Sequence, residues 1–276
     1  MFFRNKPTDV KKKRIRDNIV IIALAFIFIA SSGMILMHFI NEALMQRRSN
    51  QARQIMYEVT TRPLTSLTPQ QILTVYEAYE EPSRRVDFDA LREAFGNDDI
   101  IAHLSIEYTI VNYLVVQTTN NDFYQNHDIW RNRSSAGWVF LDYEVDLTGE
   151  DENIVIYAHN TRIEHKFHTL RHFTSNDFFR LHPYITLITP YGVYSWEIFS
   201  FYSTFIDFSY NVINFPDETQ RSYMIRQFAA NSMHPSNVSA SPDDRILTLS
   251  TCTGRHRDER FVLHARLASV EKFLDH

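Results

Sequence analysis

Residues 245–252 read Arg-Ile-Leu-Thr-Leu-Ser-Thr-Cys, a run of mostly aliphatic and β-branched side chains that ends in the only cysteine of the chain. This composition predicts a buried β-strand. Residues 153–160 read Asn-Ile-Val-Ile-Tyr-Ala-His-Asn and predict a second strand, which ends at His159 and Asn160. Residues 260–267 read Arg-Phe-Val-Leu-His-Ala-Arg-Leu, and their alternation of apolar and polar side chains predicts a third. The ends of these strands carry a thiol, an imidazole and a guanidinium group.

Similar runs occur from residue 100 onward, and short polar segments separate them. We expect strands at residues 100–108, 109–117, 138–142, 153–158, 184–189, 193–201, 245–251 and 260–267. About eight short strands with few helices between them predict a mostly β fold, a closed antiparallel or mixed β-barrel rather than an alternating βαβ sheet. Peripheral helices are expected at residues 166–173, 176–181 and 217–232.

The N-terminal part has a different composition. The first 17 residues carry seven Lys or Arg and two Asp, whereas residues 19–40 contain no Asp, Glu, Lys or Arg. A helix of about 22 residues rises about 33 Å, enough to cross a bilayer. Because flanking basic residues stay in the cytoplasm, we expect a cytoplasmic segment at 1–18, a single transmembrane helix at 19–40 and an extracytoplasmic remainder. The alternative is a cleaved signal peptide, whose apolar core is usually shorter, about 7–15 residues.

A helical arm is expected between this anchor and the barrel, at residues 41–97. Residues 42–60 suit an amphipathic helix, and a second helix is expected to begin at Thr68, with Pro69 in its first turn. Residues 87–95 suit a third helix that ends at Gly96. Residues 98–276 would then form the barrel domain.

Composition and charge exclude several classes of protein. One cysteine rules out a disulfide scaffold, and the net charge of −5, without a basic stripe in the body, disfavours nucleic-acid binding. His165, His168 and His172 have helical spacing, but no carboxylate or cysteine completes a metal site at similar spacing. We therefore expect no metal and no cofactor.

The three strand ends suit acyl transfer. A thiolate attacks a carbonyl, an imidazole gives a proton to the leaving amine, and a cation stabilises the oxyanion. An inert core thiol is the alternative for Cys252. His159 is favoured as the base because it follows a strand directly, whereas His264 is expected to be a half-buried strand residue and His256 a solvated loop residue.

At these residues the sequence resembles the class B sortases, the membrane-anchored transpeptidases of Gram-positive bacteria. Thr248-Leu-Ser-Thr-Cys252 is similar to the family signature TLxTC, and Ile156-Tyr-Ala-His159-Asn160 resembles I-Y-G-H-N. Gly137-Trp-Val-Phe-Leu-Asp142 resembles G-x-x-F-L-D, and Arg260-Phe-Val follows the cysteine as the family arginine does. The resemblance covers most of residues 86–270, together with the N-terminal anchor.

The resemblance implies a sortase β-barrel in which Cys252 is the nucleophile, His159 the general acid/base, and Arg260 the group that positions substrate and stabilises the oxyanion. Ser250 and Thr251, beside the nucleophile, are expected to contact substrate. Such an enzyme cleaves a sorting motif near the C-terminus of an exported protein. It holds the acyl part as a thioester and passes it to an amine of a cell-wall precursor or a pilin.

Two departures from the family pattern bear on the loop after His159. Ala158 stands where the family usually has Gly, and residues 162–166 lack the usual glycine-containing turn. The loop at residues 253–259 is short and highly charged. Two other functions remain open from the sequence: a cysteine peptidase that hydrolyses the same thioester, and a non-catalytic, membrane-tethered peptide-binding module.

Overall fold

The computed structural model describes residues 86–149, 151–161 and 166–273, together with single positions between residues 20 and 54. The chain divides into two compact units, Met1–Asn50 and Gln51–His276. Most of the predicted anchor at 19–40 and the predicted arm helices near 42–60 and from Thr68 lie outside the described residues. Within the described residues, no helix has both the length and the apolar character that crossing a bilayer requires.

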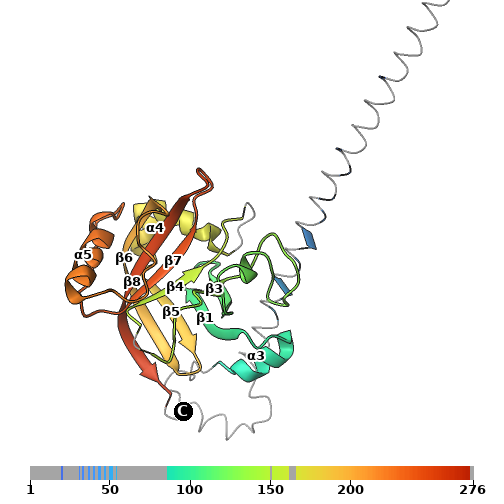
Figure 1. The fold of residues 1–276 in the computed structure, drawn as a ribbon, viewed down its shortest axis with the longest axis horizontal. Coiled ribbons are helices and arrows are strands. Elements are labelled where there is room, and N and C mark those ends of the chain that lie inside the picture. The colour runs from blue at the N-terminus through green and yellow to red at the C-terminus, as the bar shows by residue number, and fades with distance from the viewer. Residues whose placement is uncertain are drawn as a thin grey trace, which may run out of the picture. The chain divides into compact units, whose positions relative to one another are not determined.

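Eight strands close into a barrel, and Figure 1 shows how the labelled strands are arranged. In chain order they are β1 (Ile100–Ile106), β2 (Asn112–Val116), β3 (Phe140–Leu141), β4 (Asn153–Tyr157), β5 (Tyr184–Thr189), β6 (Gly192–Phe205), β7 (Ile246–Cys252) and β8 (Glu259–Lys272). Around the barrel the order is β1-β2-β3-β4-β7-β8-β6-β5. The β2–β3 and β4–β7 pairs are parallel and the others antiparallel. The predicted mostly β fold, a closed barrel of about eight strands, is confirmed.

The strands are buried according to their place in the barrel. In β1 every second residue is buried, beginning with Ile100, as expected for a strand with one face toward the core. β4 and β7 are buried almost throughout, because side chains on both of their faces pack against other parts of the domain. These two strands pair in parallel, and both end near the candidate site.

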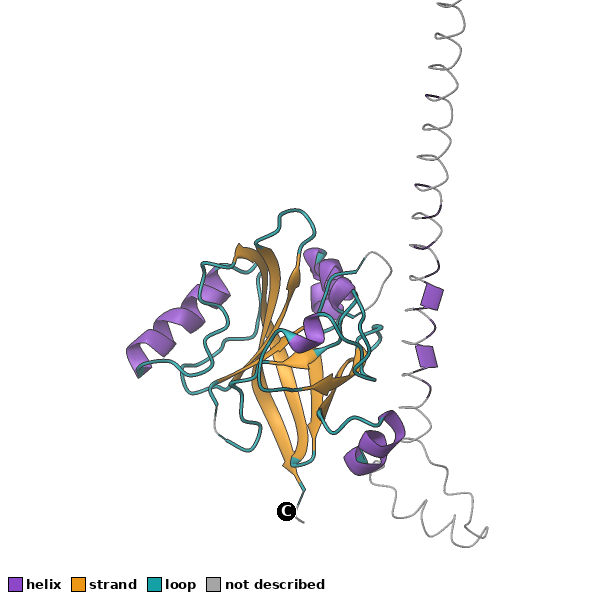
Figure 2. Ribbon diagram, turned by 45° about the vertical axis from the view of Figure 1, so that its right-hand side comes forward, coloured by secondary structure: helices purple, strands orange, loops and turns teal. Residues whose placement is uncertain are grey.

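Helices lie outside the barrel (Figure 2). They are α3 (Phe88–Phe95), η1 (Phe123–Gln125), η2 (Phe167–Thr174), α4 (Asn176–Leu181) and α5 (Glu218–Ala230). The helix expected at 166–173 is present as η2, a 3-10 helix. The predicted end of α3 is confirmed, because Gly96 has φ +59° and its N–H bonds to the last turn.

A second hydrophobic cluster lies between α5 and the outer face of β6, β7 and β8. His264 packs against three of its aromatic rings, and it is fully buried rather than half-buried as predicted. The ring stacks on Phe228 at 3.9 Å and lies between the Tyr202 hydroxyl and Thr248, each 2.8 Å from a ring nitrogen. Burial lowers the pKa of His264 to about 3, so the ring stays neutral and serves as a structural link rather than a base.

The same polar chain continues into the segment between β6 and α5. Thr248 donates to Asn153 Oδ1 at 2.7 Å. The Asn153 amide donates in turn to the main-chain oxygens of Val212, at 2.9 Å, and Tyr210, at 3.3 Å. This segment is thereby fixed against β4, which places Tyr210 next to the candidate site.

Candidate active site

Strand register brings the three predicted catalytic residues to one end of the barrel. In the parallel β4–β7 pair, Tyr157 is level with Ser250. His159 and Cys252 each lie two residues further on, His159 beyond the end of β4 and Cys252 as the last residue of β7. In the antiparallel β7–β8 pair, Cys252 lies directly opposite Arg260. The thiol is therefore flanked by the imidazole-bearing segment on one side and by the guanidinium-bearing strand on the other.

A small cavity of about 140 Å³ opens at this end of the barrel. Every site residue predicted from the sequence lines it. The lining residues are Asn121, Gln125, Phe140, Tyr157, Ala158, His159, Ser250, Thr251, Cys252 and Arg260. The structure therefore brings the predicted set together and adds residues that precede β3, for which sequence reasoning gave no indication.

The His159 ring is held by a main-chain group. Its Nε2 lies 2.8 Å from the carbonyl oxygen of Gln125, which directly follows Tyr124 in η1. Since a carbonyl oxygen only accepts, Nε2 carries the hydrogen in this contact. The side chain is half-buried, so its ring is accessible from the cavity.

Cys252 has a half-buried thiol at the end of β7. Its main-chain carbonyl accepts a hydrogen bond from Asn160 Nδ2 at 2.7 Å. The Oδ1 atom of the same amide bonds to Nδ1 of His168, on η2. Asn160 was missed as a site residue, although its position next to His159 could have indicated it.

Arg260 is held by carbonyl groups of the loop before it. Nη1 donates to the oxygen of Arg257 at 2.8 Å and to that of Glu259 at 3.2 Å. Within the described part of the chain Arg260 makes no salt bridge. A guanidinium that no carboxylate neutralises is suited to stabilise a developing oxyanion.

Ser250 and Thr251 are buried and bonded within the protein. Thr251 Oγ1 donates to the Ala158 carbonyl at 2.7 Å, and Ser250 Oγ donates to the Tyr210 hydroxyl at 3.1 Å. Burial raises the pKa of Tyr210, and the Cys252 thiol also raises it, whereas Ser250 and Arg260 lower it. The hydrogen bonds of Ser250 and Thr251 thus join β7 to the segment between β6 and α5 and to the residue that follows β4.

The departures noted in the sequence have different consequences. The described non-glycine residues with positive φ are Tyr108, Arg131 and Lys166, so Ala158 has an ordinary backbone conformation and replaces glycine without left-handed strain. Lys166, at the end of the segment that lacks glycine, has φ +59° and ψ −123°, a region that glycine favours. Its N–H donates to the buried Tyr113 hydroxyl at 2.8 Å, which stabilises this conformation.

A hydrogen bond and an ion pair hold charged side chains of the loop between β7 and β8 in place. Thr253 donates to the Glu259 carboxylate at 2.7 Å, and Arg255 forms an ion pair with it at 2.6 Å. The Thr253 hydrogen bond is the largest cause that holds the pKa of Glu259 below its usual value; burial opposes it, and Arg255 lowers the pKa further. His256 is exposed in this loop, as predicted.

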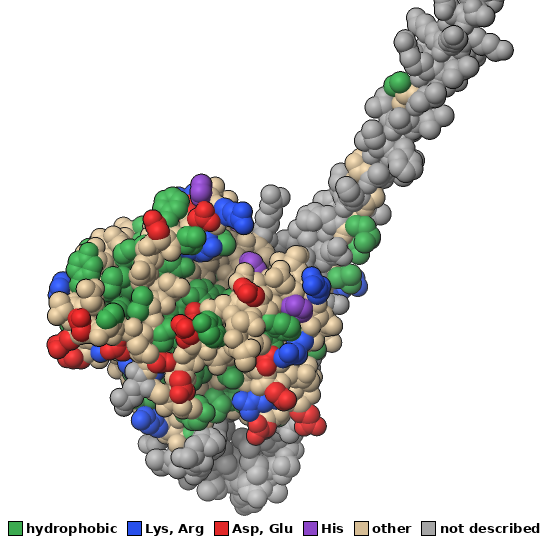
Figure 3. All heavy atoms as spheres, viewed as in Figure 1, with side chains coloured by type: hydrophobic (Ala, Val, Ile, Leu, Met, Phe, Trp, Pro, Cys, Tyr) green, Lys and Arg blue, Asp and Glu red, His purple; other side chains and the backbone are tan. Residues whose placement is uncertain are grey.

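The histidine stripe forms no metal site in the described residues. His165 lies outside them, His172 is exposed and His168 is buried against Asn160. No group of three or more His, Cys, Asp or Glu side chains in the described ranges is placed to hold a metal. On the face of the molecule in Figure 3, acidic and basic side chains are interspersed.

Comparison with known proteins agrees with this arrangement. The family model "Sortase domain" matches residues 104–268. A sortase B of Listeria monocytogenes is 33% identical over 175 residues, which are 63% of this chain and 71% of the relative. The structure of a Staphylococcus aureus sortase B–substrate complex has a TM-score of 0.62 and 26% identity, covering 73% of this chain and 93% of the other. A sortase B complexed with triglycine has a TM-score of 0.66 and 25% identity, covering 83% and 98%.

The chain therefore belongs to the sortase family. Because its relatives and structural neighbours are sortases B, it is a cysteine transpeptidase of class B, as the sequence motifs predicted. This classification excludes the non-catalytic binding module that the sequence left open.

Proposed function

We propose that Cys252 is the nucleophile of this transpeptidase, that His159 is its general acid/base and that Arg260 stabilises the oxyanion. The observation that carries the proposal is the shared cavity: strand register places the three side chains around it, with the thiol in the middle. These residue types suit acyl transfer through a covalent intermediate. Ser250 and Thr251 would contribute by holding the walls of the cavity.

The reaction would proceed in two stages. In the first, the Cys252 sulfur attacks the scissile carbonyl of a sorting motif, Arg260 stabilises the negative oxygen, and His159 gives its proton to the leaving amine. In the second, His159 takes a proton from an incoming amine, which attacks the thioester and releases Cys252. Transfer and hydrolysis differ only in whether an amine or water resolves the thioester.

The substrates are inferred from the structural neighbours. One neighbour is a substrate complex and another holds triglycine, which has a primary amine at its N-terminus. We infer that this enzyme takes a sorting-signal peptide of an exported protein as acyl donor. The acceptor would be an amine of a cell-wall precursor or a pilin.

The proposed location is the cell membrane of a Gram-positive bacterium. Residues 19–40 would form a single transmembrane helix, with the basic segment 1–18 in the cytoplasm and the barrel outside. The support is the uncharged run of residues and the basic flank that precedes it. Alkaline extraction of membranes would test the anchor, since removal of residues 1–40 should release the protein.

Product analysis tests the activity. The full chain is incubated with a library of sorting-signal peptides, with and without triglycine, and products are identified by mass. We expect cleavage in both cases and a triglycine adduct only when the amine is present. Cys252→Ala should give neither product. A product that carries only water even at high triglycine concentration would favour the peptidase, and cleavage by Cys252→Ala would contradict the proposed nucleophile.

A further inference from the structure

We propose that residues 117–139, between β2 and β3, orient the catalytic histidine. In this proposal the Gln125 carbonyl fixes the tautomer of His159, and Gly137 allows the loop to approach the ring. The proposal rests on the acid/base function proposed above for His159. It assigns the proton exchange to one nitrogen of the ring, and it assigns the orientation of the ring to a main-chain group.

The tautomer follows from the contact between His159 and Gln125. Nε2 is 2.8 Å from the Gln125 oxygen, which only accepts hydrogen bonds. Nε2 therefore keeps its hydrogen in the neutral ring as well as in the charged ring. In the neutral ring the lone pair that can accept a proton is therefore on Nδ1. A hydrogen bond at one ring nitrogen of a catalytic histidine commonly selects the tautomer in this way.

Gly137 shows how closely the loop approaches the ring. It has φ +55°, and a Cβ atom there would lie 2.5 Å from the Tyr124 oxygen, 2.8 Å from the Gln125 oxygen and 2.9 Å from His159 Cδ2. The Cδ2–Nε2 edge of the ring therefore faces the loop. The opposite edge, which carries Nδ1, faces away from it.

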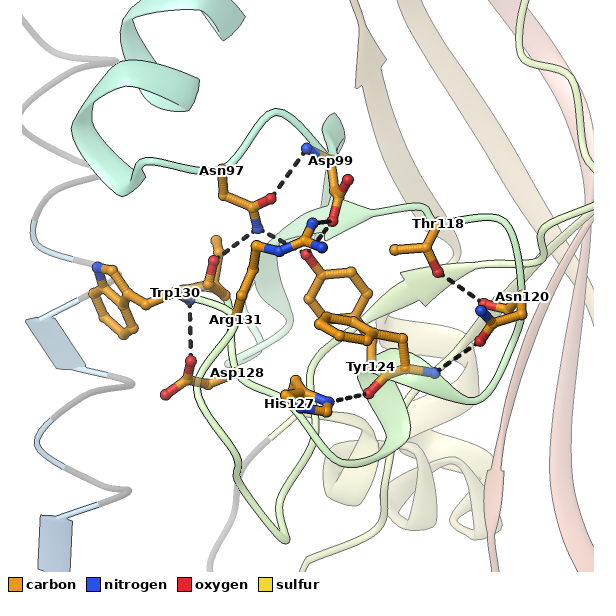
Figure 4. A network of polar contacts seen from close by, with 11 residues as sticks. Asn97, Asp99, Thr118, Asn120, Tyr124, His127, Asp128, Trp130 and Arg131 are labelled. Atoms are coloured by element: carbon orange, nitrogen blue, oxygen red, sulfur yellow. Dashed lines mark hydrogen bonds and ion pairs between the residues drawn. The ribbon is translucent and has the colours of Figure 1, made fainter.

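A polar network holds the loop on both sides of Gln125 (Figure 4). The Tyr124 hydroxyl donates to Asp99 at 2.7 Å and accepts from Asn97 at 2.8 Å. Arg131 pairs with the same carboxylate, and Trp138 N–H donates to the Tyr124 oxygen at 2.8 Å. The carbonyl that bonds to His159 is thus attached to a fixed framework, as preorganised positioning requires.

The proton steps balance on Nδ1. It takes the proton of the Cys252 thiol, which gives a thiolate and an imidazolium. The thiolate sulfur then bonds to the substrate carbonyl carbon as the C=O π pair moves to the oxygen, and this pair re-forms C=O when the amine leaves. As the C–N bond breaks, Nδ1 returns the proton to the leaving amine. The hydrogen on Nε2 stays on that nitrogen throughout and is donated to the Gln125 oxygen.

Nitrogen NMR of the histidine rings tests the tautomer directly. The full chain is labelled with ¹⁵N at histidine, and His159→Gln identifies the His159 signals. At a pH where the ring is neutral, we expect a protonated, pyrrole-type Nε2 and an unprotonated, pyridine-type Nδ1. The same spectra of Cys252→Ala report which nitrogen of the His159 ring is protonated when no thiolate is present. Protonation of Nδ1 in the neutral ring would overturn the proposal.

Substitution of Gly137 tests the orientation. Gly137→Ala should displace the loop or the ring, lower kcat at least 10-fold with little change in KM, and mix the two tautomers. Gly96→Ala is the matched control, because Gly96 has nearly the same φ, +59°, but a Cβ there would contact nothing within 4 Å. It should lose stability without a change in kcat. A folded Gly137→Ala enzyme with normal kcat and an unchanged tautomer would overturn the proposal.

The two proposals fail separately. If no sorting peptide reacts with Cys252, the proposed function is wrong, yet the NMR spectra still report which ring nitrogen is protonated. If the enzyme turns over normally but His159 is protonated at Nδ1, only the role of the loop is wrong. Should Gly137→Ala not fold, the spectra of the unmutated chain decide.

Discussion

The side-chain amide of Asn160 donates a hydrogen bond to the main-chain carbonyl of Cys252, with 2.7 Å between nitrogen and oxygen. The bond joins the residue after the proposed base to the proposed nucleophile. Since β4 and β7 are parallel neighbours whose ladder ends at Tyr157 and Ser250, it extends their pairing beyond the last ladder residues. It thus helps to set the spacing of thiol and imidazole.

Removal of this amide should affect catalysis more than stability. We expect Asn160→Ala to lower kcat about 10-fold, equivalent to about 1.4 kcal/mol, and to lower the free energy of unfolding by about 1 kcal/mol. Steady-state kinetics and urea unfolding measure the two effects. Asn231→Ala, at an exposed helix end, serves as control and should change neither. Normal kcat in a folded Asn160→Ala enzyme would show that the bond does not position the site.

The geometry of the Arg260 guanidinium should matter beyond its charge. Lysine keeps the charge but cannot donate to two loop carbonyls and an oxyanion in the same planar arrangement. We expect Arg260→Lys to lower kcat/KM about 10- to 100-fold, a loss of about 1.4–2.7 kcal/mol of transition-state stabilisation. Arg226→Lys on the exposed face of α5 is the control. Turnover close to normal in Arg260→Lys would exclude the proposed role.

The Tyr124 hydroxyl should stabilise the loop that carries Gln125. Burial, and then the hydrogen bond to Asp99, raise the pKa of Tyr124, so it remains a neutral donor. Tyr124→Phe leaves the Asp99 carboxylate without this donor and should cost about 1–3 kcal/mol in the free energy of unfolding. The exposed Tyr143→Phe should cost almost nothing. Equal unfolding midpoints for both variants would show that the network does not brace the loop.

His264 should make stability depend on pH. Its pKa is about 3 in the folded protein and about 6.5 when unfolded, because burial disfavours the charged ring. Between these values the unfolded chain binds one more proton. The contribution of this residue is therefore complete above pH 6.5 and is lost as the pH falls toward 3, by about 1.4 kcal/mol per pH unit.

His264→Phe isolates this contribution. The variant loses two hydrogen bonds but keeps an aromatic ring against Phe228, so it should be less stable near neutral pH. Its free energy of unfolding should fall less steeply than that of the unmutated protein from pH 6.5 to pH 4. Urea unfolding at several pH values measures both slopes. Parallel slopes would mean that His264 does not titrate on unfolding.

The positions of all eight strands followed from runs of β-branched and aromatic residues, but most of their ends did not, β5 at Tyr184–Thr189 being predicted with the right bounds. β6 and β8 extend beyond the predicted residues, to Phe205 and Lys272, since they pair with each other along most of their length. Conversely, β3 comprises only Phe140–Leu141 of the predicted 138–142. Strand ends depend on partners and register, which one-dimensional patterns do not contain.

The candidate site was predictable where side chains carry it. Cys252 ends β7, His159 follows the end of β4 and Arg260 lies at the start of β8, and sequence motifs indicated all three. The Gln125 carbonyl was not predictable, because every residue has one and only the fold selects it. Gly137 offered a signal, as one of only six glycines in the chain. The His159 ring that it approaches, however, belongs to a different part of the sequence. The proposed tautomer of His159 could therefore be inferred only from the structure.

The most direct test of the account is the mass of the acyl-enzyme. The full chain is mixed with sorting-signal peptides without any amine, quenched in acid and measured by intact mass, with digestion to locate the modified residue. We predict an added mass equal to the acyl part of one peptide, carried on Cys252 and absent in Cys252→Ala. An adduct on another residue, or cleaved peptide from the Cys252→Ala chain, would contradict the account.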